Sequence, residues 1–174
     1  MTKKIVFLAL HLSYGGTERA IISEANMLVK RYEVEIISFY HLCDKPAFEV
    51  DPRVKITYLT EGLKPNRDEI KNAIKSKRPL QLLKECSKSI KILYLRTTSM
   101  KKAIKKSNGD VLISTRYLYH KLVTENAKDG VVCIAQEHNH HNNNEEYIKK
   151  QIESVKQMDY FCLLYTSPSP RDVE

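Results

Sequence analysis

The sequence has no tryptophan, its aromatic content is only 8%, and its four cysteines show no C-x-x-C spacing. Few side chains are therefore available to stack on bases, no nucleic-acid-binding motif is present, and we expect no nucleic-acid partner. Apolar runs stay well below the roughly 18 to 20 residues of a membrane span. The apolar start at 5–10 is too short and too strand-like for a signal peptide. We expect a cytoplasmic protein with reduced thiols.

A short apolar strand runs into the paired glycines Gly15 and Gly16, which precede a helical pattern. Free backbone N–H groups at such a helix start form a site for a phosphate group. The third glycine of a dinucleotide-binding fingerprint and the lysine of a P-loop are both missing. From this loop alone, a diphosphate site and a tight turn without a ligand remain equally open.

Strand patterns alternate with helical patterns along most of the chain, which is long enough for one domain with one core. This alternation predicts an α/β fold with a Rossmann-like, doubly wound parallel sheet in the order 3-2-1-4-5-6. One long helical region is interrupted near Pro79. Helical faces are expected at Ile21, Ala25 and Leu28, and at Ile148, Ile152 and Val155. The expected strands are 3–10, 34–40, 54–59 at an edge, 111–114, 131–135 and one beginning at 160.

Ligands of parallel sheets gather at the carboxyl ends of the strands. This rule brings three loops to one rim, namely 11–18, 114–116 and 136–139. In the expected order, strands one and five lie about 10 Å apart, a distance that a sugar diphosphate can bridge.

The string KIVFLALHLSYGGTER, followed by ISEANMLVKRYEVEIISFY, resembles the N-terminal domain of two-domain, GT-B-type glycosyltransferases of family 4. The resemblance covers residues 3–161 and includes the segment Glu137-His138-Asn139. It implies an acceptor-side domain over 1–161 and a donor-binding C-terminal domain outside this chain. It also implies retaining transfer from a nucleotide sugar to a glycan or lipid-linked acceptor, in cell-surface polysaccharide or glycolipid synthesis. The piece alone is then expected to be inactive.

The resemblance also suggests roles for individual residues. His138 is the expected catalytic residue beside the donor sugar, and the glycine loop is expected to meet the diphosphate or the acceptor. The remaining substrate-binding candidates are Gly15, Gly16, Thr17, Glu137 and Asn139, with His11 and Arg116 as further residues of the rim. Without the resemblance, the loop around His138 is better interpreted as an ordinary polar surface loop. Neither a cofactor nor a metal ion is expected, because the nearby histidines lack a ligand spacing.

Positive charge is concentrated in residues 64–106, which contain fourteen lysines and arginines and three acidic residues. Such a helical face either is simply solvated or contacts an anionic membrane surface, and we keep both interpretations. The second one makes the protein peripheral on the inner face of a membrane. The net charge of +8 also leaves room for a nonenzymatic, basic polyanion-binding α/β domain. Half of a GT-B-fold sugar-nucleotide epimerase is a further alternative.

Residues 162–172, CLLYTSPSPRD, match the conceptual translation of a transposase-type sequencing-library adapter residue by residue. We therefore expect 162–174 to be an artefact tail and the natural protein to continue differently after Phe161. The alternative is a Ser/Pro turn that closes a real protein.

Overall fold

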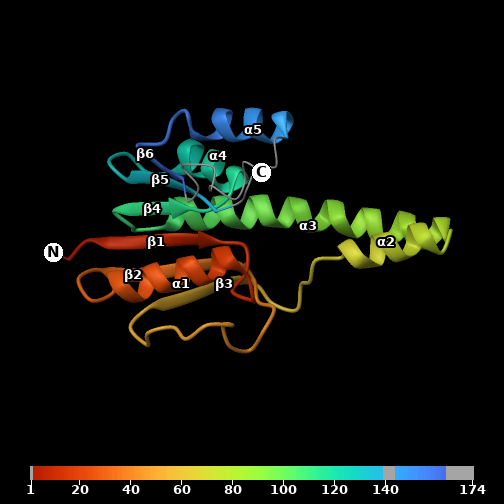
Figure 1. The fold of residues 1–174 in the computed structure, drawn as a ribbon, viewed down its shortest axis with the longest axis horizontal. Coiled ribbons are helices and arrows are strands. Elements are labelled where there is room, and N and C mark those ends of the chain that lie inside the picture. Colours follow the sequence, from red (N-terminus) through yellow and green to blue (C-terminus); the bar gives the residue numbers. More distant parts are fainter. Residues whose placement is uncertain (1, 139–143, 164–174) are drawn as a thin grey trace, which may run out of the picture.

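The computed structural model describes residues 2–138 and 144–163, which form a six-stranded parallel sheet between helices (Figure 1). The strands lie in the order β3-β2-β1-β4-β5-β6. Both the predicted fold class and the predicted strand order are confirmed. The strands are β1 (Lys4–Ala9), β2 (Glu33–Tyr40), β3 (Lys55–Thr60), β4 (Val111–Ser114), β5 (Val132–Glu137) and β6 (Tyr160–Leu163). The helices are α1 (Gly16–Leu28), α2 (Arg67–Lys75), α3 (Pro79–Lys106), α4 (Tyr117–Asn126) and α5 (Glu145–Val155).

The central strand β1 is buried on both faces, so its sequence is continuously apolar rather than alternating. Phe7 belongs to the core on the side of α1, together with Ile21 of that helix. Leu8, the next residue, belongs to the second core, together with Met100 of α3. Because successive side chains of a strand point to opposite faces, β1 joins the two cores.

Helices α2 and α3 form a hairpin that extends well beyond the sheet (Figure 1). Pro79 occupies the first turn of α3, where its missing N–H costs nothing, so the predicted interruption is confirmed. Asn66 ties the hairpin together, because its side-chain amide donates to the Glu85 carbonyl at 2.8 Å and accepts from the Ser89 hydroxyl at 2.8 Å. The α2–α3 hairpin therefore has a defined geometry, although much of it lies outside the main core.

Two predictions about elements are wrong in detail. Strand β5 continues through Glu137, so two residues that we expected in the following loop belong to the strand. In α5 the expected apolar position Ile152 is 55% exposed, whereas Gln151 and Ser154 are buried. This helix packs against α4, and Ile152 lies about 100° around the helix from Gln151, toward solvent.

The last described strand extends two residues into the segment that we expect to be an artefact. Cys162 and Leu163 pair with Gln136 and Glu137 of β5. Residues 164–174, which hold the rest of that segment, lie outside the described residues. Within the described ranges, none of the helices combines the length and apolar character needed to cross a membrane.

Candidate functional site

The carboxyl ends of β1, β4 and β5 meet at one rim of the sheet. Leu8 is paired with Ser114, and Ser114 is paired with Ala135, so the three strands end close to the same level. The loops that we predicted to converge therefore leave the sheet side by side.

The two glycines at the start of α1 have different roles. Gly15 precedes the helix, and its carbonyl accepts from the Arg19 amide at 3.0 Å. A Cβ atom at Gly15 would overlap the carboxylate of Glu18, whereas a Cβ at Gly16 would meet no atom within 4 Å. A side chain at Gly15 would thus have to displace the end of the Glu18 side chain, whereas Gly16 leaves open space beside the backbone. Thr17 is half-buried in the first turn.

Glu18 joins two of the predicted site residues, His11 and Arg116, into what we call the Glu18 cluster. Its side chain is only 5% exposed, and Oε1 lies 3.5 Å from His11 Nδ1 and 3.8 Å from Arg116 Nη2. Burial lowers the pKa of His11, Arg116 adds to this effect, and Glu18 opposes it. His11 is therefore neutral near pH 7. Sequence reasoning missed Glu18, because an acidic residue in the first turn is favoured at any helix start.

His138 follows β5 directly and is half-buried. Its Nε2 lies 3.3 Å from Gln136 Oε1, and the Gln136 amide donates to Glu24 of α1 at 2.8 Å. Burial lowers the pKa of His138, against the opposing effect of Glu24 and then of Glu137 and Glu18. With Nε2 donating to Gln136, the neutral ring has its acceptor at Nδ1, which is buried without a hydrogen-bond partner among the described residues.

Glu137, predicted to act beside His138, faces a different part of the molecule. Its carboxylate accepts from the hydroxyl of Tyr147 in α5 at 3.1 Å. Because β5 continues to this residue, Gln136 is directed toward α1 and Glu137 toward α5. Glu137 thus holds the Tyr147 hydroxyl of α5. The predicted site residue Asn139 lies outside the described residues.

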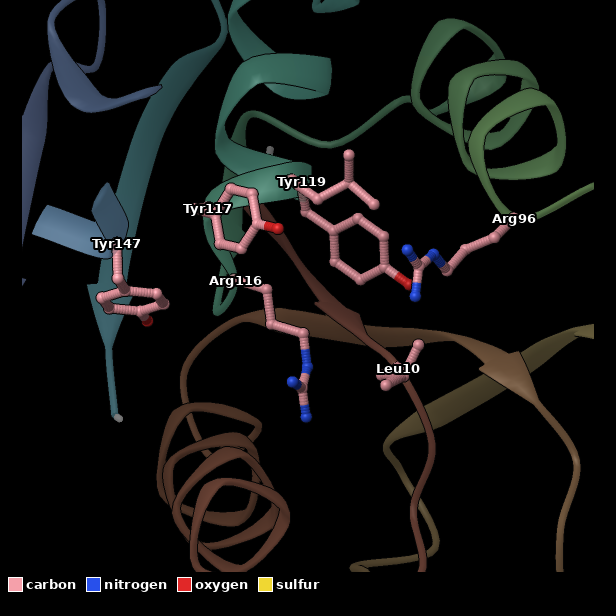
Figure 2. Close-up of a pocket in the computed structure, with 7 residues that line it drawn as sticks. Leu10, Arg96, Arg116, Tyr117, Tyr119 and Tyr147 are labelled. Atoms are coloured by element: carbon pink, nitrogen blue, oxygen red, sulfur yellow. The ribbon is translucent and has the colours of Figure 1, made fainter. Parts of the chain in front are cut away.

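A cavity of about 360 Å³ opens at the start of α4 (Figure 2), and we call it the tyrosine–arginine cavity. Of the predicted site residues, Arg116 lines it. Sequence reasoning missed Arg96, which it counted among the solvated charges of 64–106. A signal was present, since Arg96 lies at four-residue spacing from Ile92 and Met100 on the buried face of α3. The lining residues are Leu10, Arg96, Arg116, Tyr117, Leu118, Tyr119 and Tyr147.

One Ser–His contact lies in the core rather than in either site. Ser114 Oγ is 2.6 Å from His120 Nδ1, and both residues are fully buried. Burial lowers the pKa of His120 to about 4, so this ring stays neutral and serves as an internal hydrogen-bonding group.

Comparison with known proteins finds two curated relatives, while no family model matches the chain. An exopolysaccharide phosphotransferase of Streptomyces coelicolor is 29% identical over 131 residues, covering 71% of this chain and 14% of that protein. The second relative is 30% identical over 168 residues, covering 91% of this chain and 38% of that protein. It is the GalNAc-alpha-(1->4)-GalNAc-alpha-(1->3)-diNAcBac-PP-undecaprenol alpha-1,4-N-acetyl-D-galactosaminyltransferase of Campylobacter jejuni.

Among solved structures, the chain is similar to the apo form of the lipopolysaccharide outer core galactosyltransferase WaaB. The TM-score is 0.52 at 15% identity, and the match covers 91% of this chain and 38% of that protein. This likeness concerns the fold, a Rossmann-like parallel sheet flanked by helices. The chain spans well under half the length of each of these three proteins.

Proposed function

We propose that this chain is the N-terminal, acceptor-side part of a glycosyltransferase of the family 4 type. The complete enzyme moves a sugar from a nucleotide-sugar donor to a glycan or lipid-linked acceptor in polysaccharide or glycolipid synthesis. The observation that carries the proposal is the meeting of His138, the open backbone at Gly16 and Arg116 around one rim. Support comes from the Campylobacter relative, whose name describes an N-acetylgalactosaminyltransferase.

In this proposal each group at the rim has a separate task. Neutral His138 accepts a hydrogen bond from a hydroxyl of the donor sugar and so orients the sugar. The backbone at Gly16, the start of α1 and the Arg116 guanidinium stabilise the charge of the leaving diphosphate without a metal ion. Glu18, whose carboxylate is buried, holds Arg116 toward α1. The donor-binding domain supplies the remaining contacts.

We also propose that the α2–α3 hairpin contacts an anionic membrane surface that carries the acceptor. Its apolar residues Leu80, Leu83, Ile90 and Tyr94 recur along one side of α3 and are exposed, Leu80 to 84% and Leu83 to 70%. Lysines at 84, 88 and 91 are exposed on the same stretch of the helix. Exposed apolar groups beside lysines are typical of helices that lie at a membrane surface. The hairpin projects from the sheet, so it can reach such a surface (Figure 1).

A second candidate reaction is phosphoryl transfer, because the Streptomyces relative is named a phosphotransferase. The two reactions differ in which group reaches the acceptor. With a nucleotide sugar labelled separately in the sugar and in the phosphate next to it, glycosyl transfer moves the sugar label alone. Transfer of a sugar phosphate moves both labels.

The test of the proposed function needs a longer protein. The chain as it stands is expected to transfer no sugar, because half of a two-domain cleft cannot exclude water or orient both substrates. Extension of the gene beyond Phe161 from its source genome should add a second Rossmann-like domain and create nucleotide-sugar-dependent transfer. A folded, extended protein that neither binds nucleotide sugars nor transfers sugar would contradict the proposal.

A further inference from the structure

We infer that the tyrosine–arginine cavity binds an anionic group, a phosphate or a carboxylate, that is attached to a saccharide. We assign this saccharide to the acceptor, and that assignment rests on the proposed function. The presence of an anion site is independent of the proposed function, because it follows from the charges and burial of the cavity itself.

Two arginines line the cavity from separate elements, Arg96 from α3 and Arg116, the residue that precedes α4. The Nε atoms of both are buried without a hydrogen-bond partner among the described residues. In the described part of the chain, Arg96 has no ion pair, and Arg116 has only the 3.8 Å approach to Glu18. None of the described lining residues is acidic. Partly buried cations of this kind are stabilised by an incoming anion, and guanidinium groups match phosphate and carboxylate geometry.

Tyr119 adds an independent observation. This residue is only 1% exposed, and its hydroxyl is buried without a hydrogen-bond partner among the described residues. The hydroxyl points toward the guanidinium of Arg96 at the cavity wall (Figure 2). Since a guanidinium group only donates hydrogen bonds, it leaves the proton of the tyrosine hydroxyl available. An anion between the two side chains would accept from both of them.

The start of α4 strengthens the site. The amides of Tyr119 and His120 donate to the Arg116 carbonyl, at 2.8 Å and 3.0 Å, and so close the first turn. Tyr117 and Leu118, at the two preceding positions, also line the cavity. The start of α4, where the helix dipole is positive, therefore lies at the same cavity as the two arginines.

Size and aromatic lining indicate that the anion is part of a larger molecule. The volume of about 360 Å³ lies in the range of small-molecule sites and exceeds what a free phosphate needs. Tyr117 and Tyr147 form one side, with ring centroids 6.0 Å apart and an edge-to-face arrangement. Such rings offer apolar contact together with hydroxyl groups, which suits a sugar ring.

Direct binding to the 174-residue chain tests the inference without any turnover. The probes are glucose 1-phosphate, glucuronate, glucose, inorganic phosphate and UDP-glucose, measured by calorimetry or by NMR titration. At least one charged sugar should bind tenfold or more tightly than both glucose and inorganic phosphate. UDP-glucose should not displace it. Arg96→Gln should weaken binding of the charged sugar by roughly ten- to a hundredfold, the scale for one charge-assisted hydrogen bond.

Tyr119→Phe distinguishes an effect on binding from an effect on folding, because it should weaken binding without lowering the stability of the fold. Removal of an unpartnered buried hydroxyl should leave the melting temperature unchanged or raise it, while binding of the charged sugar weakens. The matched controls are Arg31→Gln and Tyr160→Phe, which change exposed residues elsewhere and should alter neither property.

Three results would overturn the inference. The first is that neither glucose 1-phosphate nor glucuronate binds, and the second is that glucose binds as tightly as the charged sugars. The third is that the Arg96→Gln protein binds the charged sugar as tightly as the Arg31→Gln protein. Displacement by UDP-glucose would assign the cavity to the donor and overturn the acceptor assignment. If an extended protein transfers no sugar while Arg96-dependent binding persists, the proposed function fails and the anion site stands.

Discussion

Arg116 connects the loop after β4 to the first turn of α1, with its Nη2 3.8 Å from Oε1 of Glu18. The same side chain lines the tyrosine–arginine cavity on its other side (Figure 2). Arg116 is thus shared between the start of α1, where we propose the donor diphosphate, and the cavity that we assign to an anionic acceptor.

The glycine loop leads to the first prediction, in which neighbouring substitutions have different results. Gly15→Ala should destabilise the fold by about 1 to 3 kcal/mol, because the new Cβ displaces the buried Glu18 carboxylate. Gly16→Val should leave the fold intact, since the space beside Gly16 is open, but should weaken substrate binding in an extended enzyme. Urea unfolding and nucleotide-sugar titration measure the two effects. A stable Gly15→Ala protein, or unchanged binding by Gly16→Val, would contradict these roles.

The second prediction concerns His138 in an extended, active enzyme. His138→Ala should lower turnover roughly 10- to 1000-fold and leave the fold intact, because one oriented polar group near the developing charge is lost. His41→Ala serves as the control, since that ring stacks on Tyr58 on the β2–β3 side of the sheet.

The pH profile of the same enzyme provides a second measurement. Burial holds the pKa of His138 below its usual range, so the rate should stay level through neutral pH. It should fall on acidification, once a proton occupies Nδ1. If His138→Ala turned over substrate at the parental rate, the assignment of His138 to the site would be wrong, and the residue would belong to an ordinary surface loop.

A third prediction concerns the inner strands β1 and β2, where Lys4 and Glu35 form a buried ion pair. Lys4 Nζ lies 2.8 Å from Glu35 Oε2, and both side chains are about nine-tenths buried. Lys4→Met should cost about 3 kcal/mol of unfolding free energy, because the Glu35 carboxylate then loses its closest cation. Lys4→Met combined with Glu35→Met should cost less than Lys4→Met alone. A double variant that is less stable than the single one would contradict this account.

This pair also sets a pH dependence of stability. Burial favours the neutral form of Glu35, but hydrogen bonds from Lys4, Thr57 and Lys55 outweigh it and hold the pKa below its usual value of 4.5. The stabilisation is therefore present above the unfolded-state pKa and is lost as the pH falls through the lower folded-state pKa. Glu35→Gln should show a smaller loss of stability on acidification than the parent. If the unfolding free energies of the parent and of Glu35→Gln, measured in urea, fall equally on acidification, Glu35 does not contribute to the acid destabilisation.

The fourth prediction tests the proposed membrane contact of α3. Cosedimentation should show binding to anionic vesicles that decreases with salt, and little binding to neutral vesicles, with each lysine near the surface contributing up to about 1 kcal/mol. Leu83→Glu together with Ile90→Glu should abolish binding. Met27→Glu, at an exposed position of α1, should leave it unchanged. Equal binding to both kinds of vesicle, or to neither, would contradict the proposal.

The sequence alone determined the architecture, and it did so through local signals. Apolar strands separated by amphipathic helices required a parallel sheet. Gly15 and Gly16, between β1 and α1, identified the rim on which sites are built. These features are readable because strand and helix periodicity, the backbone preferences of glycine and proline, and the connection rules act over a few neighbouring residues.

Which side chains share a site depends on the packing of elements that are distant in sequence. This packing turned Arg96 inward from a stretch that the sequence predicts as solvated, buried Glu18 between His11 and Arg116, and brought the Glu137 carboxylate to the hydroxyl of Tyr147. It also left Ile152 in solvent, because α5 presents a different face to α4. These outcomes depend on the facing surfaces of elements that are distant in sequence. The charge, burial and hydrogen bonding that define the cavity arise only once those surfaces meet.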